Sequence, residues 1–518
     1  MTTITEKMDR SRVYGFLTAK GEHMVNSRGE EVLLTGMGLG NWLVPEGYMW
    51  RLGGRYNSPR RIEALVRDLC GSAYAAYFWR EFRENYITEA DVRAMADAGF
   101  NSVRVPINWR VLLEDEPGIT WKEDGFRLLD RFLDWCEKWR LYVVLDIHCA
   151  PGGQTGSNID DSIDDIPRLF TDTRSDAWEK ALALWEQIAK RYRDRWIVGM
   201  YDLLNEPCRS PMPDAPELPN LDHRLKAFYK EVIARIRQVD KLHMLSLEGP
   251  QWATRVDIFD EHYDDNMCLH FHRYWLPPTP DAYTPYLEKR TQWQYPLYLG
   301  ETGENHMEWF SAMYPMSAEL NIGYNIWPWK KMDTDSSPCS VRKPAGWDDI
   351  IAYSNGGDRP SYAEAQAAFD GYLQNMRYEN CDHVANVIPS IFRRPGCSIR
   401  ACAWKQMENV AMVDESGVSV TTDWEKAQAQ FTPGSWAEYT FYATDDPGVL
   451  VFEADFDGAM LAVTENGETL LRTSAGGVRK FRIEKKCTGD SLVRIECMKG
   501  SFHLRRIHYL PSQGESAK

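Results

Sequence analysis

The sequence predicts a (β/α)8 barrel followed by an all-β domain, and three observations lead to this prediction. Short apolar runs of strand length recur along roughly the first two thirds of the chain, and amphipathic helical stretches separate most of them. Most of these runs end in a polar or aromatic residue, as barrel strands do where they reach an active site. After about residue 387 the chain changes to short alternating runs without helical periodicity.

The apolar runs read as buried strands, because a parallel barrel is covered by helices outside and packed with side chains inside. Eight such runs fit the pattern, which is the number that a closed barrel of this class requires. They are Val32–Leu39, Ser102–Ile107, Tyr142–His148, Met200–Glu206, His243–Glu248, Met267–Tyr274, Pro296–Glu301 and Gly323–Trp327.

Helical stretches with one apolar face precede several of these strands, and the units around the sixth and seventh strands show little helical pattern. In one stretch, the apolar positions from Leu128 to Cys136 lie on a single stripe. Strand and helix alternating in this way favour a barrel spanning residues 12–380. The predicted helices are Thr88–Ala98, Arg127–Trp139, Ala177–Tyr192, Leu225–Val239 and Tyr362–Asn375.

The remainder of the chain, residues 387–511, is predicted to form an antiparallel β-sandwich. Its short alternating runs are bounded by Gly, Pro and Asp, which favour turns. Examples are Trp436–Tyr442, Val449–Phe456, Met460–Glu465, Val478–Ile483 and Ser491–Cys497. The connection around Asn375–Pro389 is not rich in Gly or Ser, so we expect the two domains to share a fixed interface.

Composition excludes some classes of function. The formal net charge is -16 and the pI about 5.3, whereas nucleic-acid-binding proteins present a basic surface. The chain contains 20 Trp and 25 Tyr, and flat aromatic rings suit the C–H faces of sugars as well as a protein core. These values predict a carbohydrate ligand better than a nucleic acid.

The cysteines and the N-terminal segment indicate in which cellular compartment the protein is expected. Eleven cysteines are scattered without paired spacing, which indicates reduced thiols of a cytoplasmic protein. The stretch from Met1 to Tyr14 is charged and lacks the apolar core of a signal peptide. No window approaches the length of uncharged apolar sequence that spans a bilayer, so no membrane association is expected.

Two glutamates carry the strongest chemical signal. The segment Tyr201–Pro207 reads YDLLNEP, and Leu299–Gly303 reads LGETG. Each is an apolar run that ends in a glutamate beside a turn residue, which is how a barrel strand delivers a carboxyl group to the mouth of the barrel. Two carboxyl groups that meet in one cleft can divide the acid and nucleophile work of breaking a glycosidic bond.

Polar and aromatic groups also lie at the ends of the other strands, and packing alone explains such a set poorly. The first strand leads to Glu46. The other strand-end groups are Arg104, His148, Asn205, Glu248, His270, His272, Tyr274 and Trp327.

Three longer motifs resemble glycoside hydrolase family 5, a family of retaining (β/α)8 glycosidases. They are TGMGLGNWLVPE at Thr35–Glu46, SVRVP at Ser102–Pro106 and LDIHCAPGGQTG at Leu145–Gly156. The resemblance covers roughly Val13 to Asn375 and is strongest to exo-β-1,3-glucanases and their β-glucosidase relatives. It implies a retaining, exo-acting enzyme for β-glucosidic bonds, without metal or cofactor. The lack of a secretion signal favours small β-glucosides or β-gluco-oligosaccharides as substrates, because polymers do not enter the cytosol.

The resemblance also implies a role for each matching position. Glu206 matches the acid/base, Glu301 the nucleophile, and Asn205 the residue that binds the sugar 2-hydroxyl. Arg104 and Tyr274 match the partners of the nucleophile. The other matches are His148 and His272 in the cleft, Trp327 under the innermost sugar, and Glu46 at the pocket floor.

Three alternatives stay open at this point. Endo-action, as in cellulases, uses the same two glutamates. A sugar-binding protein without turnover is a second alternative, which the presence of both glutamates disfavours. His270 and His272 lie on one face of a strand, so a metal-dependent hydrolase is a third.

The C-terminal region suggests a carbohydrate-binding module through GSWAEYT at Gly434–Thr440. A sandwich that only supports the barrel fits this sequence equally well. The sequence gives no indication of the oligomeric state.

Overall fold

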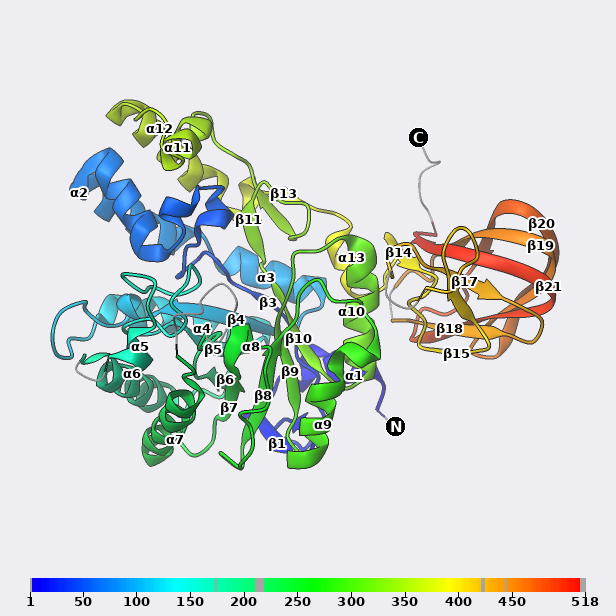
Figure 1. Ribbon diagram of the computed structural model, residues 1–518, viewed down its shortest axis with the longest axis horizontal. Helices are drawn as coiled ribbons and strands as arrows, with labels where there is room; N and C mark the ends of the chain where they lie inside the picture. The colour runs from blue at the N-terminus through cyan, green and yellow to red at the C-terminus, as the bar shows by residue number, and fades with distance from the viewer. Residues whose placement is uncertain (1, 173–174, 210–218, 421–423, 443–444, 513–518) are drawn as a thin grey trace.

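The computed structural model describes residues 2–172, 175–209, 219–420, 424–442 and 445–512 (Figure 1). Its larger part is a closed barrel of parallel strands, in the order β10-β3-β4-β5-β6-β7-β8-β9, which confirms the predicted barrel. The strands are β3 (Thr35–Gly38), β4 (Ser102–Asn108), β5 (Tyr142–Cys149), β6 (Val198–Asp202), β7 (Met244–Glu248), β8 (Met267–His272), β9 (Leu297–Gly303) and β10 (Gly323–Trp327).

The helices surround this barrel, and their buried faces complete one continuous apolar core with the strands. The predicted helix at 177–192 has these bounds in the structure, while those predicted at 127 and 225 begin a few residues earlier. The helices around the barrel are α1 (Ile4–Met8), α2 (Pro59–Asn85), α3 (Glu89–Ala98), α4 (Glu123–Trp139), α5 (Arg168–Thr171), α6 (Ala177–Tyr192), α7 (Asp222–Val239), α8 (Pro250–Ala253), α9 (Thr284–Trp293), α10 (Met307–Glu319), α11 (Trp347–Ser354), α12 (Tyr362–Asn375) and α13 (Val387–Ile391).

Two regions differ from the simple repeat. The long α2, which the sequence analysis did not assign, is interrupted at Gly71 by a positive φ of 75°. The buried positions continue across the kink at Val66, Cys70, Tyr74 and Phe78, so the interruption lies in the backbone and not in the apolar spacing. The weak helical pattern near the sixth and seventh strands also has a structural basis, since β7 is followed only by the four-residue α8.

The C-terminal region is all-β, as predicted, and has its own core. The long β21 pairs antiparallel with four other strands, so the domain is organised around it. A hairpin of β19 and β20 extends the sheet on one side (Figure 1). The strands are β14 (Cys397–Arg400), β15 (Gln406–Glu408), β16 (Ala411–Val413), β17 (Gln428–Phe431), β18 (Trp436–Phe441), β19 (Val449–Glu465), β20 (Glu468–Glu484) and β21 (Ser491–Leu510).

Polar contacts join this domain to α10 of the barrel. The buried Arg393 guanidinium donates to the backbone oxygens of Ser311, Ala403 and Thr440, at 2.6, 2.8 and 3.2 Å, and so links both domains. On the same face, Glu308 forms ion pairs with Arg400 and Arg506. The buried Arg393 contacts and the partly exposed ion pairs of Glu308 together fix the position of one domain on the other.

We therefore predict that the C-terminal domain contributes stability more than catalysis. A chain ending at Pro395 should lose the acceptors of Arg393 in the sheet and expose apolar surface of α10, which should lower the melting temperature by about 5 °C or more. Turnover of a small soluble glycoside by the folded fraction should change less than about twofold, since none of the described C-terminal residues has a side chain lining the cavity at the barrel mouth. An equally stable truncated chain that loses only polysaccharide affinity would instead indicate a binding module.

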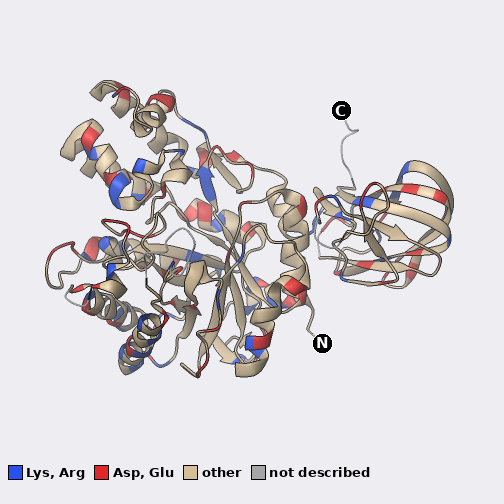
Figure 2. Ribbon diagram, in the orientation of Figure 1, with Lys and Arg blue, Asp and Glu red and all other residues tan. Residues whose placement is uncertain are grey.

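The charged residues, the cysteines and the helices can each be compared with what the sequence predicts. Acidic and basic residues are interspersed along the outer helices (Figure 2). Each of the eleven cysteines is a free thiol, as the sequence predicts. Within the described ranges, no helix has both the length and the apolarity that crossing a bilayer would require.

Candidate active site

The carboxyl ends of the barrel strands surround a cavity of ≈ 490 Å³. Seven of the nine predicted site residues line it. Arg104 and Asn205 lie beneath its floor and are fully buried. The cavity is lined by Glu46, Tyr48, His148, Asn158, Ile159, Glu206, Trp252, Thr254, His272, Arg273, Tyr274, Trp275, Leu276, Glu301, Glu304 and Trp327. The structure thus brings together residues that are far apart in the sequence.

Arg104, on β4, is the centre of the polar network in the barrel. Its Nη1 donates to Glu301 Oε2 at 2.8 Å, and its Nη2 donates to Asn205 Oδ1 at 2.8 Å. The other ion pairs are with Asp202 Oδ2 at 2.9 Å, Asp146 Oδ2 at 3.1 Å and Glu248 Oε1 at 3.1 Å. One permanent cation therefore holds several carboxyl groups in place, and burial makes its hydrogen bonds directional and strong.

Glu301, at the end of β9, is held by donors on both oxygens. Tyr274 donates its hydroxyl to Oε1 at 2.8 Å while Arg104 occupies Oε2. Burial by itself would raise the pKa of Glu301, but the nearby His272 and the Arg104 guanidinium outweigh it, so the pKa lies below its usual value. Glu301 is thus an ionised carboxylate held in a fixed orientation.

Glu206 follows β6 in a strained backbone conformation, with φ at +40°. Its N–H donates to Glu248 Oε2 at 2.6 Å, and its carbonyl oxygen accepts from Thr155 Oγ1 at 2.6 Å, which fixes the turn. Burial, followed by the charges of Glu301 and Glu248, raises the pKa of Glu206 well above its usual value. The turn therefore presents a carboxyl group that keeps its proton near neutral pH.

The two glutamates face each other across His272. One carboxyl oxygen of Glu206 and one of Glu301 lie within 4.8 Å of each other, with a His272 nitrogen inside the same distance. His272 Nδ1 is 2.7 Å from Glu206 Oε1. When the pKa values of two neighbouring carboxyl groups shift in opposite directions, the protonated group can act as a general acid and the ionised group as a nucleophile.

His148 and Asn205 form a second hydrogen-bonded pair. His148 Nδ1 lies 2.7 Å from Asp146 Oδ2, and Asn205 Nδ2 lies 3.3 Å from His148 Nε2. Burial and the charge of Arg104 lower the pKa of His148 to about 3, so the ring is neutral. The Asn205 side chain is therefore fixed at both ends, by Arg104 and by His148.

Trp327 and Glu46 complete the predicted set. The Trp327 ring stacks parallel to the His148 ring, with centroids 5.5 Å apart, and its Nε1 donates to the Tyr48 hydroxyl at 2.7 Å. Burial, then the charge of Glu301, raises the pKa of Glu46 well above its usual value. A flat indole at the cavity floor is a platform for the C–H face of a sugar.

The sequence analysis did not assign Asp146 or Asp202 to the site, and it noted Glu248 and His270 only as strand-end groups. Side chains two residues apart on a strand share a face. Asp146 could therefore have been inferred from His148, and His270 from His272. Asp202 and Glu248 had no such signal, because contact with Arg104 depends on how the strands close into a barrel.

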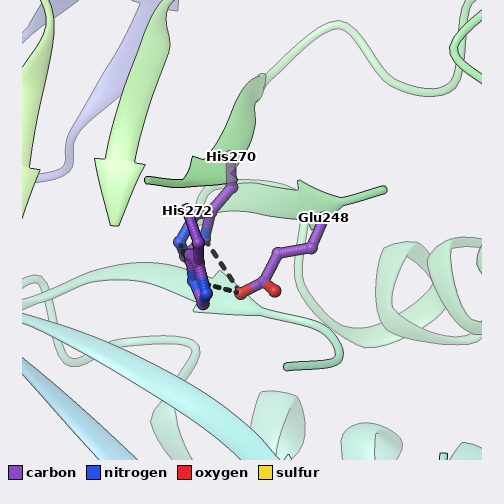
Figure 3. Close-up of side chains that lie close together, drawn as sticks. All are labelled: Glu248, His270 and His272. Carbon is purple, nitrogen blue, oxygen red and sulfur yellow. Dashed lines mark hydrogen bonds and ion pairs between the residues drawn. The ribbon is translucent and has the colours of Figure 1, made fainter. Parts of the chain in front are cut away.

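The group Glu248, His270 and His272 tests the metal-dependent alternative (Figure 3). The two histidine Nε2 atoms are 3.1 Å apart, and each ring has a nitrogen 3.4 Å from Glu248 Oε1. That oxygen already contacts the Arg104 guanidinium, and His272 uses its other nitrogen for Glu206. A permanent cation at the shared oxygen opposes a second cation, so the group fits a hydrogen-bond network better than a metal ion.

Comparison with known proteins identifies the family. The family described as cellulase (glycosyl hydrolase family 5) matches residues 70–333, slightly more than half of the chain. The chain belongs to glycosyl hydrolase family 5. The matched residues include both glutamates, Arg104 and Trp327, so the glycoside hydrolase family predicted from the motifs is confirmed.

Several relatives within this family share part of the sequence. A β-xylosidase of Phanerodontia chrysosporium is 32% identical over 300 residues, covering 57% of this chain and 59% of that protein. A probable glucan 1,3-beta-glucosidase A of Emericella nidulans is 32% identical over 207 residues, covering 39% of this chain and 48% of that protein. Endoglucanase C of Acetivibrio thermocellus is 25% identical over 318 residues, covering 49% and 88% respectively.

Among solved structures, an endogalactoceramidase matches 95% of this chain and 99% of its own length, with a TM-score of 0.50 and 16% identity. The match at this identity concerns the fold alone. It extends beyond the barrel into the C-terminal domain, so the combination of a barrel with an all-β domain occurs in another protein.

Proposed function

We propose that this family 5 glycoside hydrolase is a retaining β-glycosidase that acts by double displacement. The observation that carries the proposal is the close approach of the Glu206 and Glu301 carboxyl oxygens, within 4.8 Å. Retaining enzymes hold their two carboxyl groups about 5–5.5 Å apart, while inverting enzymes leave room for a water between them. The opposite pKa shifts of the two glutamates agree with this division of roles.

In the first step, the Glu301 carboxylate attacks the anomeric carbon and forms a covalent glycosyl ester. The bond to the leaving oxygen breaks, and Glu206 gives that oxygen its proton. Arg104 and Tyr274 hold Glu301 in line for attack. Asn205, fixed by Arg104, can bond the sugar 2-hydroxyl, where hydrogen bonds strengthen in the transition state.

In the second step, a water molecule releases the sugar. Esterification has removed the charge of Glu301, so the pKa of Glu206 falls and its carboxylate takes a proton from the water. The hydroxide attacks the anomeric carbon from the face opposite Glu301 and displaces its carboxylate. Two inversions give net retention, and both glutamates return to their starting protonation states.

For the substrate, we propose small β-glucosides or β-gluco-oligosaccharides cleaved from one end. The motifs at 35–46 and 145–156, and the relatives named as glucan 1,3-beta-glucosidase and β-xylosidase, support exo-action. The endoglucanase relatives support the alternative of internal cleavage. The form of the first product separates these possibilities.

We expect that proton NMR of the early reaction with a β-linked gluco-oligosaccharide will show β-glucose as the first product, followed by slow mutarotation. Retention gives the β-anomer because each carboxyl group directs one inversion. Early α-anomer would overturn the retaining mechanism. Early di- or trisaccharide without glucose would replace exo-action by endo-action, and the same spectra distinguish both outcomes.

A further inference from the structure

His270 is a buried histidine behind the acid/base that the mechanism above does not use. It lies on β8 two residues before His272, and both side chains point to the same side of the strand toward Glu248 (Figure 3). Its ring is fully buried. Gly300 on β9 makes room for this ring, because a Cβ at that position would lie 1.8 Å from His270 Nε2. The strands β8 and β9 together therefore fix the position of the His270 ring.

The Nδ1 atom of His270 carries a proton. Its neighbours are Ser246 Oγ at 2.9 Å, Asp202 Oδ1 at 3.2 Å and Glu248 Oε1 at 3.4 Å. Asp202 Oδ2 accepts from the Arg104 guanidinium Nε at 2.9 Å, so Asp202 is an ionised carboxylate that can only accept. A ring nitrogen facing an ionised carboxylate is stable as an N–H donor.

The contact between the two rings then allows two proton arrangements. The Nε2 atoms of His270 and His272 are 3.1 Å apart, so one of them must donate a proton to the other. If His272 donates, its Nδ1 is an acceptor and the proton of Glu206 points to it. If His270 donates, it is an imidazolium, and the Nδ1–H of His272 points to an ionised Glu206.

These two arrangements contain the same three protons and differ only in their positions. Passing from the first to the second, Glu206 gives its proton to His272 Nδ1 while His272 gives its Nε2 proton to His270. The negative charge of Glu206 is then balanced by a positive charge on His270 beside Asp202. No proton enters or leaves the protein in this exchange.

We propose that Asp202, His270 and His272 form a proton relay behind Glu206, in which His270 is a positioning residue offering the acid/base proton a second site. The proposal rests on the proposed role of Glu206 as acid/base. In this arrangement, the apparent pKa of the acid/base is a property of the coupled groups Glu206, His272 and His270 together, and not of the Glu206 carboxyl group alone.

The charged and titratable groups around His270 come from every strand packed against it. On its own strand the neighbour is His272. The others are Arg104 from β4, Asp202 from β6, Glu248 from β7 and Tyr298 from β9, whose ring packs edge-on at 5.1 Å between centroids. Of these, only Asp202, Glu248 and His272 contact a His270 nitrogen through a polar atom, and Tyr298 contributes packing.

The test compares His270→Phe with Tyr298→Phe as a matched control in the same packed layer. In His270→Phe, the Nε2–H of His272 keeps only Glu248 as an acceptor, so His272 Nδ1 stays an acceptor and the proton can reside on Glu206 alone. The alkaline limb of kcat/KM against pH should move to lower pH by about one unit for an alkyl β-glycoside, because a proton with one site fewer is released more readily. On the acidic side of this limb the rate should not fall, because each protonated molecule then carries the proton on Glu206.

A 2,4-dinitrophenyl β-glycoside separates this effect from a general structural loss. Its leaving group needs little protonation, so kcat/KM in His270→Phe should stay within about threefold of the unsubstituted enzyme. Tyr298→Phe should leave both substrates and the pH profile unchanged. His270→Asn keeps a donor for Asp202 but cannot reach His272, and it should show the same shift; it replaces the Phe variant if that chain does not fold.

Two results would overturn the relay. One is an alkaline limb that stays in place or moves to higher pH in the folded His270 variant. The other is an equal loss of kcat/KM with both leaving groups, which would indicate a structural role only. Failure of the proposed function is seen separately, because the unsubstituted enzyme would then release the α-anomer or turn over neither glycoside.

Discussion

Glu301→Gly is expected to reduce turnover of all glycosides about 10⁴-fold or more, because no other carboxylate is placed to attack the anomeric carbon. The glycine leaves a space beside Arg104 and Tyr274 that a small anion can enter. Added azide should therefore restore cleavage of a 2,4-dinitrophenyl β-glycoside and form an α-glycosyl azide. Product NMR identifies the anomer.

The unsubstituted enzyme is the control for this rescue, since its nucleophile occupies the azide position and no α-azide should form. A melting curve shows whether the variant remains folded. If the product of rescue were the β-azide, the roles of Glu301 and Glu206 would have to be exchanged.

Glu206→Ala is expected to reduce kcat/KM for alkyl β-glycosides about 10³-fold, because the leaving oxygen then departs without a proton. With a 2,4-dinitrophenyl glycoside the first step should be nearly unaffected, and the glycosyl-enzyme should accumulate because no base activates water. Azide needs no base, so it should release the sugar as a β-glycosyl azide. Rate measurements with both substrates, with and without azide, check these outcomes.

The pH dependence provides a second readout of the same variant. Glu206 acts as an acid only when protonated, so activity of the unsubstituted enzyme falls as pH rises through its raised pKa. Glu301 attacks only when ionised, so activity falls as pH drops through its lowered pKa. Glu206→Ala should lose the alkaline limb and keep the acidic limb; a profile with both limbs intact would contradict the acid assignment.

Much of the fold follows from local patterns in the sequence. The strands of a parallel barrel are short apolar runs, and helices such as α6 show their period in a single stretch. The all-β character of the C-terminal region follows from the same kind of local pattern, whereas residues 387–391, predicted as the start of that region, form the helix α13, and the first strand of the sheet is β14 at Cys397–Arg400. The kinked α2 was not assigned from the sequence, although its buried positions keep helical spacing on both sides of Gly71.

The two glutamates and the family motifs around them could be recognised from the amino-acid sequence, because each lies in a short segment at the end of a predicted barrel strand. The mutual positions of Asp202, Glu248 and His270 could not be predicted from the sequence. These groups lie on three different strands, so the contacts of both carboxylates with Arg104 and with His270 depend on how the strands close into a barrel. Proton positions and pKa values depend on burial and on distances between such groups, which no single segment of sequence contains.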